Sequence, residues 1–217
     1  MNVDTSTPHG IERAGAMHLA QSGMVDVVIT PHVHEMANIF DPGHKGKLFA
    51  LIRHPIDRAV SMFYYLQTAT WEPSYDPSLQ HMTLEQYAHS DKVEENWMTR
   101  FLVNKKSEPL GPQDVVLARE ILRTKFAVGL LSRINDSMDR FAQVFGWDIS
   151  QPERRVCIQS LLTNGVNRHE HPEIERGGEI WNAFLENNRY DVELYMYTVQ
   201  LFQEQGTGLG LQDIMNF

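Results

Sequence analysis

The segment LFALIRHPIDRAVSMFYYL at Leu48–Leu66 constrains the fold most, because an apolar run meets a helical pattern there without a linker. The run Lys47–Ile52 is too short for a helix and lies between glycine and proline, which predicts a buried strand. From Pro55 onward, apolar residues recur at spacings of three and four, which predicts a helix that begins at a proline. The sequence therefore places Arg53 between the end of a strand and the start of a helix.

The rest of the chain alternates between the same two patterns. A β-branched run at Val25–Thr30 predicts a second buried strand, parallel to the first, and the run FAVGLL predicts a third. Strands that alternate with helices predict an α/β fold with a mostly parallel central sheet flanked by helices, in one domain over residues 1–217. The predicted helices lie within Ile11–Gln21, after a cap at Thr83, within Val93–Val103, Gln113–Thr124 and Ser132–Phe145, and as one long helix within Glu173–Gln205.

Charge and composition exclude several classes of protein. The formal net charge of −9 disfavours a nucleic-acid partner, which needs an excess of Lys and Arg, and also disfavours a polyanionic acceptor. The single cysteine, Cys157, excludes an intrachain disulfide and a thiolate metal cluster. No apolar stretch approaches the roughly 18 residues of a membrane span, and the N-terminus has no signal-peptide core. We therefore expect a soluble chain as given.

The junction at Arg53 has the chemistry of an anion site. Ligands of open α/β sheets bind beyond the carboxyl ends of the strands, and helix N-termini attract anions. A guanidinium fork and a hydroxyl both suit a phosphate group. Arg53 and Ser61 lie eight residues apart, so the turn between strand and helix must bring them together on one anion.

The residues RHPIDRAVS at 53–61 follow the pattern R-x-P-x-x-R-x-x-S and resemble the 3′-phosphate signature of sulfotransferases that use 3′-phosphoadenosine 5′-phosphosulfate (PAPS). The resemblance runs in order over residues 27–205. It implies a P-loop-like sulfotransferase fold, PAPS as the sulfuryl donor, and Arg53 and Ser61 as ligands of its 3′-phosphate. His54 departs from the pattern, because the family usually has Asp there.

Two further stretches, at 96–102 and 117–147, resemble the membrane-associated carbohydrate sulfotransferases, including the heparan 2-O and 6-O types. The resemblance implies transfer of a sulfuryl group from PAPS to a hydroxyl, expected to belong to a carbohydrate, without a metal ion or a nucleic acid. It also implies the Golgi lumen, with any membrane anchor in a segment that this chain does not contain. If the full-length protein does not follow the family in its localisation, we expect a cytoplasmic protein.

Two loops complete the resemblance. The segment NGVNRHEHPE at 164–173 resembles the late loop that closes over the nucleotide, which makes Arg168 the expected contact and Asn167 and His169 lesser candidates. The segment TPHVHEMANIF at 30–40 resembles the region of the 2-O type that supplies a catalytic histidine. His32 is the expected base, with His34 as the alternative, because imidazole titrates near neutral pH.

One family element is missing from its expected place. The 5′-phosphosulfate loop is a turn rich in Lys, Gly, Ser and Thr after the first strand, whereas residues 1–24 contain no Lys and no glycine-rich turn of this kind. GHKGK at 43–47 lacks the spacing of a phosphate loop and precedes a strand. We therefore expect an N-terminally incomplete sulfotransferase domain, or one that does not bind PAPS in the usual way.

Several other interpretations stay open at this stage. The chain could be a catalytically silent module that binds the nucleotide, or a different nucleotide enzyme such as a P-loop kinase. The pair His32 and His34 could instead be ordinary loop residues, or bind zinc with His44, His169 or His171. Arg58 is interpreted as structural, paired with a nearby carboxylate or covering its helix.

Overall fold

The computed structural model describes residues 3–72, 75–163 and 172–207. The protein is α/β, 59% helical, with a small parallel sheet of two strands. The chain divides into two compact units, one of residues 1–48 with the last two residues, and one of residues 49–215. The predicted α/β class is confirmed at this level, and the predicted sheet is much smaller than expected.

The first unit contains three short helices, α1 (Pro8–Ala16), α2 (Leu19–Ser22) and α3 (Val33–Ala37). Thr7 begins α1, because its side-chain oxygen accepts a hydrogen bond from the Gly10 N–H at 3.1 Å. The single helix predicted over Ile11–Gln21 is divided into two, since His18 adopts a left-handed conformation with φ 53°. Ile11, Ala14 and Met36 are the buried apolar residues of this unit.

The prediction of a strand at Val25–Thr30 is wrong. The segment forms no strand, and Val25, Val27 and Ile29 are 46%, 40% and 82% exposed. Side-chain hydrogen bonds hold it instead: Thr30 Oγ1 donates to the Thr5 carbonyl at 2.7 Å, and Thr5 Oγ1 donates to the Ile29 carbonyl at 3.0 Å. A β-branched sequence becomes a strand only where a partner strand pairs with it, and residues 3–47 offer none.

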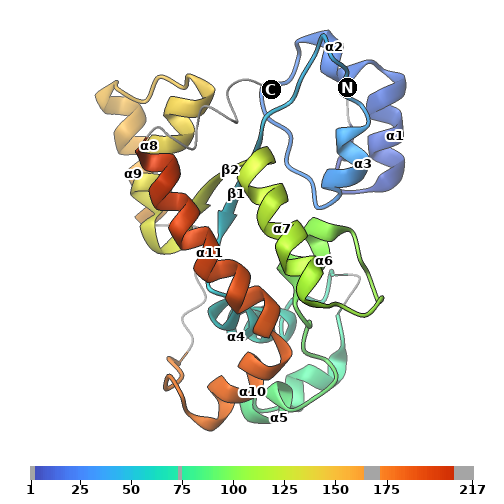
Figure 1. Ribbon diagram of the computed structural model, residues 1–217, viewed down its shortest axis with the longest axis vertical. Coiled ribbons are helices and arrows are strands. Elements are labelled where there is room, and N and C mark those ends of the chain that lie inside the picture. The colour runs from blue at the N-terminus through green and yellow to red at the C-terminus, as the bar shows by residue number, and fades with distance from the viewer. Residues whose placement is uncertain (1–2, 73–74, 164–171, 208–217) are drawn as a thin grey trace. The chain divides into compact units, whose positions relative to one another are not determined.

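The second unit carries the sheet and most of the helices (Figure 1). The strands are β1 (Leu48–Ile52) and β2 (Phe126–Leu130), both as predicted. Helices α7 and α11 pack against each other and against β2, and α8 also packs against β2. The helices and 3₁₀ turns are α4 (Pro55–Leu66), η1 (Pro77–His81), α5 (Leu84–Ala88), α6 (Trp97–Val103), α7 (Pro112–Lys125), η2 (Leu131–Arg133), α8 (Ile134–Phe145), α9 (Pro152–Thr163), α10 (Glu179–Asn187) and α11 (Arg189–Gly206).

Side chains close the outer edge of β2, where a third strand would otherwise pair. Gln205 accepts from the Val128 N–H and donates to the Phe126 carbonyl, each at 2.9 Å. Arg140 donates to the Val128 carbonyl at 3.1 Å, and Ser137 accepts from the Leu130 N–H at 2.9 Å. Because α8 and α11 satisfy these buried backbone groups, the sheet ends at β2.

Aromatic packing holds the sheet against α8. Phe49 of β1 contacts the rings of Phe141, Phe145 and Trp147, with centroid distances of 5.1, 5.4 and 6.2 Å. Gly129 lets α8 approach β2 closely, since a Cβ at that position would lie 2.6 Å from the Phe141 ring. Each buried ring contributes roughly 1.5–3 kcal/mol through the hydrophobic effect.

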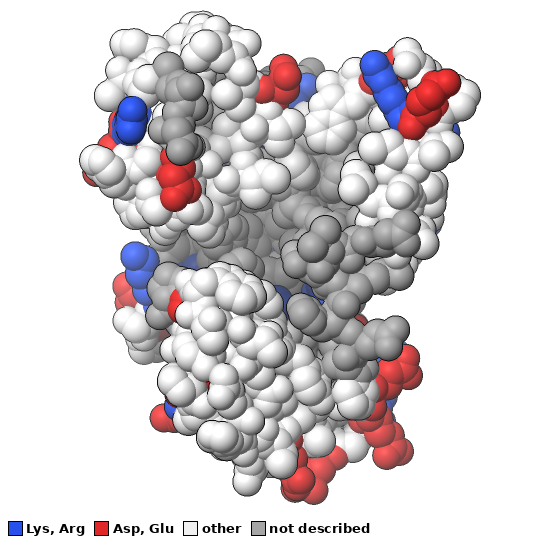
Figure 2. Space-filling model, turned by 180° about the vertical axis from the view of Figure 1, so that it is seen from behind, with Lys and Arg blue, Asp and Glu red and all other residues white. Residues whose placement is uncertain are grey.

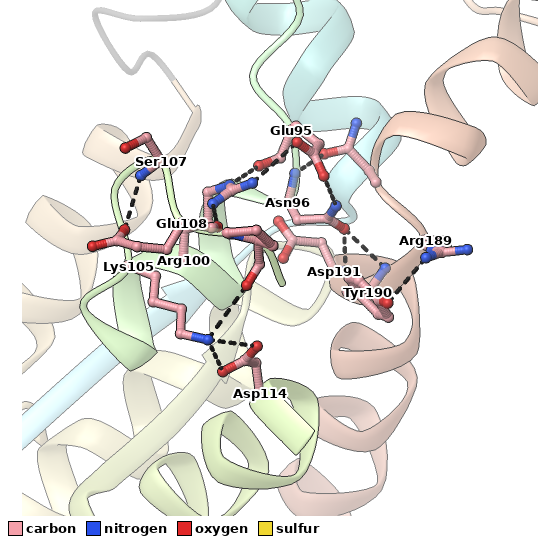
Figure 3. A network of polar contacts seen from close by, with 12 residues as sticks. Glu95, Asn96, Arg100, Lys105, Ser107, Glu108, Asp114, Arg189, Tyr190 and Asp191 are labelled. Carbon is pink, nitrogen blue, oxygen red and sulfur yellow. Dashed lines mark hydrogen bonds and ion pairs between the residues drawn. The ribbon is translucent and has the colours of Figure 1, made fainter. Parts of the chain in front are cut away.

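Helices α6 and α11 cap one another (Figure 3). The buried Asp191 carboxylate accepts from the N–H groups of Met98 and Thr99 at the start of α6, at 2.8 and 2.7 Å. In return, Asn96 Oδ1 accepts from the N–H groups of Tyr190 and Asp191 at the start of α11, at 2.9 and 3.2 Å. Each helix thus supplies the N-terminal acceptor that the other lacks in its own sequence.

This arrangement corrects two sequence predictions. The long helix predicted within Glu173–Gln205 is two helices, α10 and α11, which meet at the buried Asn188. Asn188 Oδ1 accepts from the Asn96 N–H at 3.2 Å, so the break faces the capping residues. The helix predicted over Val93–Val103 begins later, at Trp97, because Asn96 adopts a left-handed conformation with φ 47°.

The remaining predictions of elements agree with the structure. Thr83 begins α5 in a capping box with Gln86, and the predicted helices at Gln113–Thr124 and Ser132–Phe145 correspond to α7 and α8. The polar stretch after Ser150 carries one helix, α9, which has no buried residue. A search of the described helices for one both long and apolar enough to cross a membrane finds none.

Candidate functional site

Arg53 lies at the carboxyl end of β1, directly before α4. The strand ends at Ile52 and the helix begins at Pro55, so two residues form the whole connection. Arg53 is half-buried, and within the part of the chain that the structure describes it makes no hydrogen bond or ion pair. A half-buried guanidinium without a protein partner, beside the N-terminus of a twelve-residue helix, is suited to an anion.

Ser61 lies in α4 about two turns after its start, on the helix that Arg53 precedes. Its side chain is half-buried, and its hydroxyl has no hydrogen-bond partner among the described residues. Among the described residues, neither the Arg53 guanidinium nor the Ser61 hydroxyl has a polar partner; Arg53 immediately precedes α4, and Ser61 lies within it. The predicted pair stands on adjacent elements, with its polar groups available to a ligand.

His54 precedes the first residue of α4, at the position where the PAPS-dependent sulfotransferase pattern usually has Asp. Its Nδ1 accepts from the Ile56 N–H at 3.3 Å, so the neutral ring carries its proton on Nε2. The ring lies 5.0 Å from Tyr195 and 5.3 Å from Trp181, measured between centroids. His54 thus replaces the capping acceptor that Asp would provide and adds an aromatic contact to α10 and α11.

Arg58 has the structural role that the sequence predicted. It forms an ion pair with Glu94 at 2.6 Å, and its guanidinium lies 4.3 Å from the centroid of the Trp97 ring. Both contacts join α4 to the start of α6. The two arginines of the motif therefore differ, since Arg58 is paired and Arg53 has no polar partner among the residues that the structure describes.

Arg176 is a residue that the sequence reasoning missed. Its guanidinium lies 5.6 Å from the centroid of Trp181, and within the described residues it has no carboxylate partner. Its positive charge acts on His54, which places it near the start of α4. The signal in the sequence was the arginine before the glycine pair Gly177–Gly178, just ahead of α10.

The environment of His54 leads to a prediction about pH. Burial lowers the pKa of His54 below 6.5; the charge of Arg176 lowers it further, while Asp57 opposes them. Above about pH 6.5 the ring is neutral in both the folded and the unfolded chain, and its contribution to stability is fully present. As the pH falls below that value, the unfolded chain binds the proton first, so stability is lost.

We expect the urea midpoint of the wild type to fall between pH 7.5 and pH 5.5 by more than that of His54→Asn, which keeps a capping acceptor but does not titrate. The two proteins share every other titratable group, so the difference between the two isolates His54. Equal pH dependence of the two midpoints would contradict this environment for His54.

The surface carries no broad basic field on the face that Figure 2 displays. Outside its grey atoms, Lys and Arg side chains stand at separate points and do not merge into a patch. Together with the net charge of −9, this favours a local anion site over a surface for a polyanion.

The proposed base belongs to the other unit. His32 precedes α3 in the first unit, is half-buried, and forms no side-chain cap; its N–H donates to Thr30 Oγ1 at 3.0 Å. His34 lies within α3. Arg53 and Ser61 belong to the second unit, so the assignment of His32 as the base stays a prediction.

The late loop falls outside the described residues. Arg168, with Asn167 and His169, lies in the stretch 164–171, for which the structure gives no placement. His44 pairs with Asp41 at 3.0 Å, and the described residues contain no group of three His, Cys, Asp or Glu side chains that could hold a metal ion. The described residues therefore add no support to the zinc alternative.

Comparison of the chain with protein-family models, with curated proteins and with solved structures found no match in any of the three. The fold and the candidate site define a mostly helical α/β protein, with an arginine at the carboxyl end of a parallel strand that has no polar partner within the described ranges.

Proposed function

We propose that this protein is a PAPS-dependent sulfotransferase that transfers a sulfuryl group to a hydroxyl of a carbohydrate acceptor. Arg53 and Ser61 hold the 3′-phosphate of the nucleotide, and Arg176 adds positive charge near the same helix start. Arg168 closes the site from the late loop. PAPS is the sulfuryl donor, and the reaction needs no metal ion.

The chemical step is a displacement at sulfur. The acceptor oxygen attacks the sulfur atom, and the bond from sulfur to the 5′-phosphate oxygen breaks, so the electron pair leaves with 3′-phosphoadenosine 5′-phosphate (PAP). The acceptor proton passes to His32, and the product is a sulfate ester. Cationic and N–H groups near the phosphates stabilise the charge that develops on the leaving group.

One observation supports the proposal above the others. Within one nine-residue motif, Arg58 is fully engaged by Glu94 and Trp97, whereas Arg53 has no partner among the described residues. A half-buried arginine loses water without gaining a counter-ion, which costs free energy unless a ligand supplies the negative charge. The position with the free arginine is the one that the 3′-phosphate signature assigns to the ligand.

A second candidate is a catalytically silent module that binds the nucleotide. It is favoured by the absence of a phosphate loop ahead of β1, since residues 3–47 contain only a single bridge between Asp41 and His44 and no strand followed by such a loop. In this case the 3′-phosphate contacts persist, and the contacts to the 5′-phosphosulfate are missing.

Incubation of the protein with PAPS labelled in its sulfuryl group and a panel of neutral oligosaccharides separates the candidates. Labelled sulfate ester in the acceptor supports the sulfotransferase. Binding of PAP without any labelled ester supports the silent module. Failure to bind PAP would reject both.

The base assignment gives a prediction for the active protein. His32→Ala is expected to lower kcat about a hundredfold and to leave the affinity for PAP unchanged, because a general base acts on the acceptor proton and not on the nucleotide. His34→Ala is the matched control, two residues away on α3. A normal kcat for His32→Ala with a lowered kcat for His34→Ala would move the role to His34, and two normal values would remove the histidine base.

A further inference from the structure

Trp71 is the most exposed of the four tryptophans. It follows α4 and is 71% exposed. The other three tryptophans are covered: Arg58 lies over Trp97, Arg176 lies over Trp181, and Trp147 stacks on Phe145 at 5.0 Å. Within the described residues, no cation lies over Trp71, and its one ring neighbour is Tyr65 at 6.3 Å. An electron-rich aromatic face is therefore available to a ligand.

The loop that holds Trp71 is well anchored. The Ala69 side chain is fully buried, and the Glu72 N–H donates to the Ala69 carbonyl at 3.0 Å. Gln67 Nε2 donates to the Leu79 carbonyl at 3.0 Å, which ties the end of α4 to η1. The exposed Trp71 therefore lies in a hydrogen-bonded turn, two residues after the buried Ala69.

The Glu72 carboxylate lies close to this ring pair, because it accepts a hydrogen bond from the Tyr65 hydroxyl. The Tyr65 hydroxyl donates to Glu72 Oε1, and this bond raises the pKa of Tyr65, while the Trp71 indole acts on the same hydroxyl in the opposite direction. Glu72 has no cationic partner within the described residues, whereas the neighbouring Asp76 is paired with Lys92. The rings of Tyr65 and Trp71 meet at 76°, so two aromatic groups and a carboxylate border one corner.

We propose that Tyr65, Trp71 and Glu72 bind a small quaternary ammonium ion. An alkylated ammonium binds with its diffuse positive charge over the face of an indole ring, as in aromatic sites that recognise such cations. A nearby carboxylate adds electrostatic attraction to the same charge. The overall charge of −9 favours the approach of a cation. Tyr65 lies in the last turn of α4, and Trp71 and Glu72 follow the helix, whereas Arg53 precedes its N-terminal end, so this inference stands apart from the proposed sulfotransferase activity.

The test is a titration of the full chain, labelled with ¹⁵N, with choline chloride at constant ionic strength. The indole N–H resonance of Trp71 is assigned by its loss in Trp71→Phe. Choline is expected to shift this resonance with a Kd of about 1–10 mM, the range of an exposed cation–π contact aided by one carboxylate. Nε-trimethyllysine replaces choline in a second titration, to separate a free small cation from a modified side chain.

Charge recognition is isolated by a neutral isostere and by matched variants. 3,3-Dimethylbutan-1-ol has the shape of choline without its charge and is expected to bind at least about fivefold more weakly. Trp71→Leu and Glu72→Gln should each weaken choline binding about fivefold or more, and Asp76→Asn, which removes a carboxylate already paired, should not. Equal binding of choline and the isostere, an unchanged Kd in Glu72→Gln, or no shift up to about 50 mM choline would overturn the proposal.

Discussion

Replacing Asp191 by alanine is expected to lower the free energy of unfolding by about 3–5 kcal/mol. The carboxylate accepts three hydrogen bonds at the start of α6: two from backbone N–H groups and one from Thr99 Oγ1 at 2.7 Å. Asp191 is 2% exposed, so water cannot easily replace what alanine removes. Each buried donor left without an acceptor costs roughly 1–3 kcal/mol.

Denaturation in urea, with wild type and variants compared at one pH, measures the effect. Asp191→Asn keeps the shape of the side chain and one acceptor oxygen, so it should lower the free energy of unfolding by less than Asp191→Ala does. The asparagine variant therefore still tests the role of Asp191 if the alanine variant does not fold. Glu193→Ala is the matched control on the same helix, because Glu193 is an exposed partner of Arg119 in a surface ion pair worth about 1 kcal/mol or less. Equal losses for Asp191→Ala and Glu193→Ala would contradict the capping role of Asp191.

Arg53→Ala is expected to lower the affinity for PAP by two to three orders of magnitude. A guanidinium that binds a phosphate through two charge-assisted hydrogen bonds contributes roughly 3–6 kcal/mol, because each such bond is worth about 1.5–3 kcal/mol; the expected loss corresponds to the lower part of this range. Arg53 forms no hydrogen bond or ion pair with another described residue, so its removal breaks none there and should not lower the unfolding midpoint.

Arg58→Ala is the matched control for Arg53→Ala, since it removes the other arginine of the same motif. It breaks the ion pair with Glu94 and the contact with Trp97, so it should lower stability and leave the affinity for PAP nearly unchanged. The two variants are therefore expected to show opposite patterns, with binding lost in one and stability lost in the other.

The parts of the fold that could be predicted are those whose signals are local. Pro55 and the apolar spacing after it predict α4, and Thr83 with Gln86 predicts α5, because the residues that begin each helix lie next to it. The strands β1 and β2 were predicted from short apolar runs, and both have a partner. Val25–Thr30 carries the same signal and forms no strand, since pairing is a tertiary property.

The start of α11 was missed for a related reason. Its caps come from Asn96, which lies 95 residues before Asp191, so no local pattern reveals the break at Asn188. The limited size of the sheet was equally hidden, because Gln205 reaches β2 from α11 to occupy its edge. Contacts of this range are set by packing and not by local propensity.

Some residues of the candidate site could likewise be predicted from the sequence, and others could not. Arg53, Ser61 and Arg58 were predicted from one motif, and the structure adds a distinction between its arginines: Arg58 is paired, and Arg53 has no polar partner among the described residues. Arg176 could not be placed from the sequence, since it reaches the start of α4 only through the fold that brings Trp181 onto His54. The roles of Arg53, Ser61, His32 and Arg168 stay predictions.

We propose that Arg53 binds the 3′-phosphate of the donor nucleotide. Calorimetric titration of PAP into the wild type, Arg53→Ala and Arg58→Ala measures this contribution. Adenosine 5′-monophosphate, which lacks the 3′-phosphate, serves as the control ligand. The wild type and Arg58→Ala are expected to bind PAP with similar affinity and far more tightly than the control ligand, while Arg53→Ala loses this preference. Equal affinity of the wild type and Arg53→Ala for PAP would contradict this proposal.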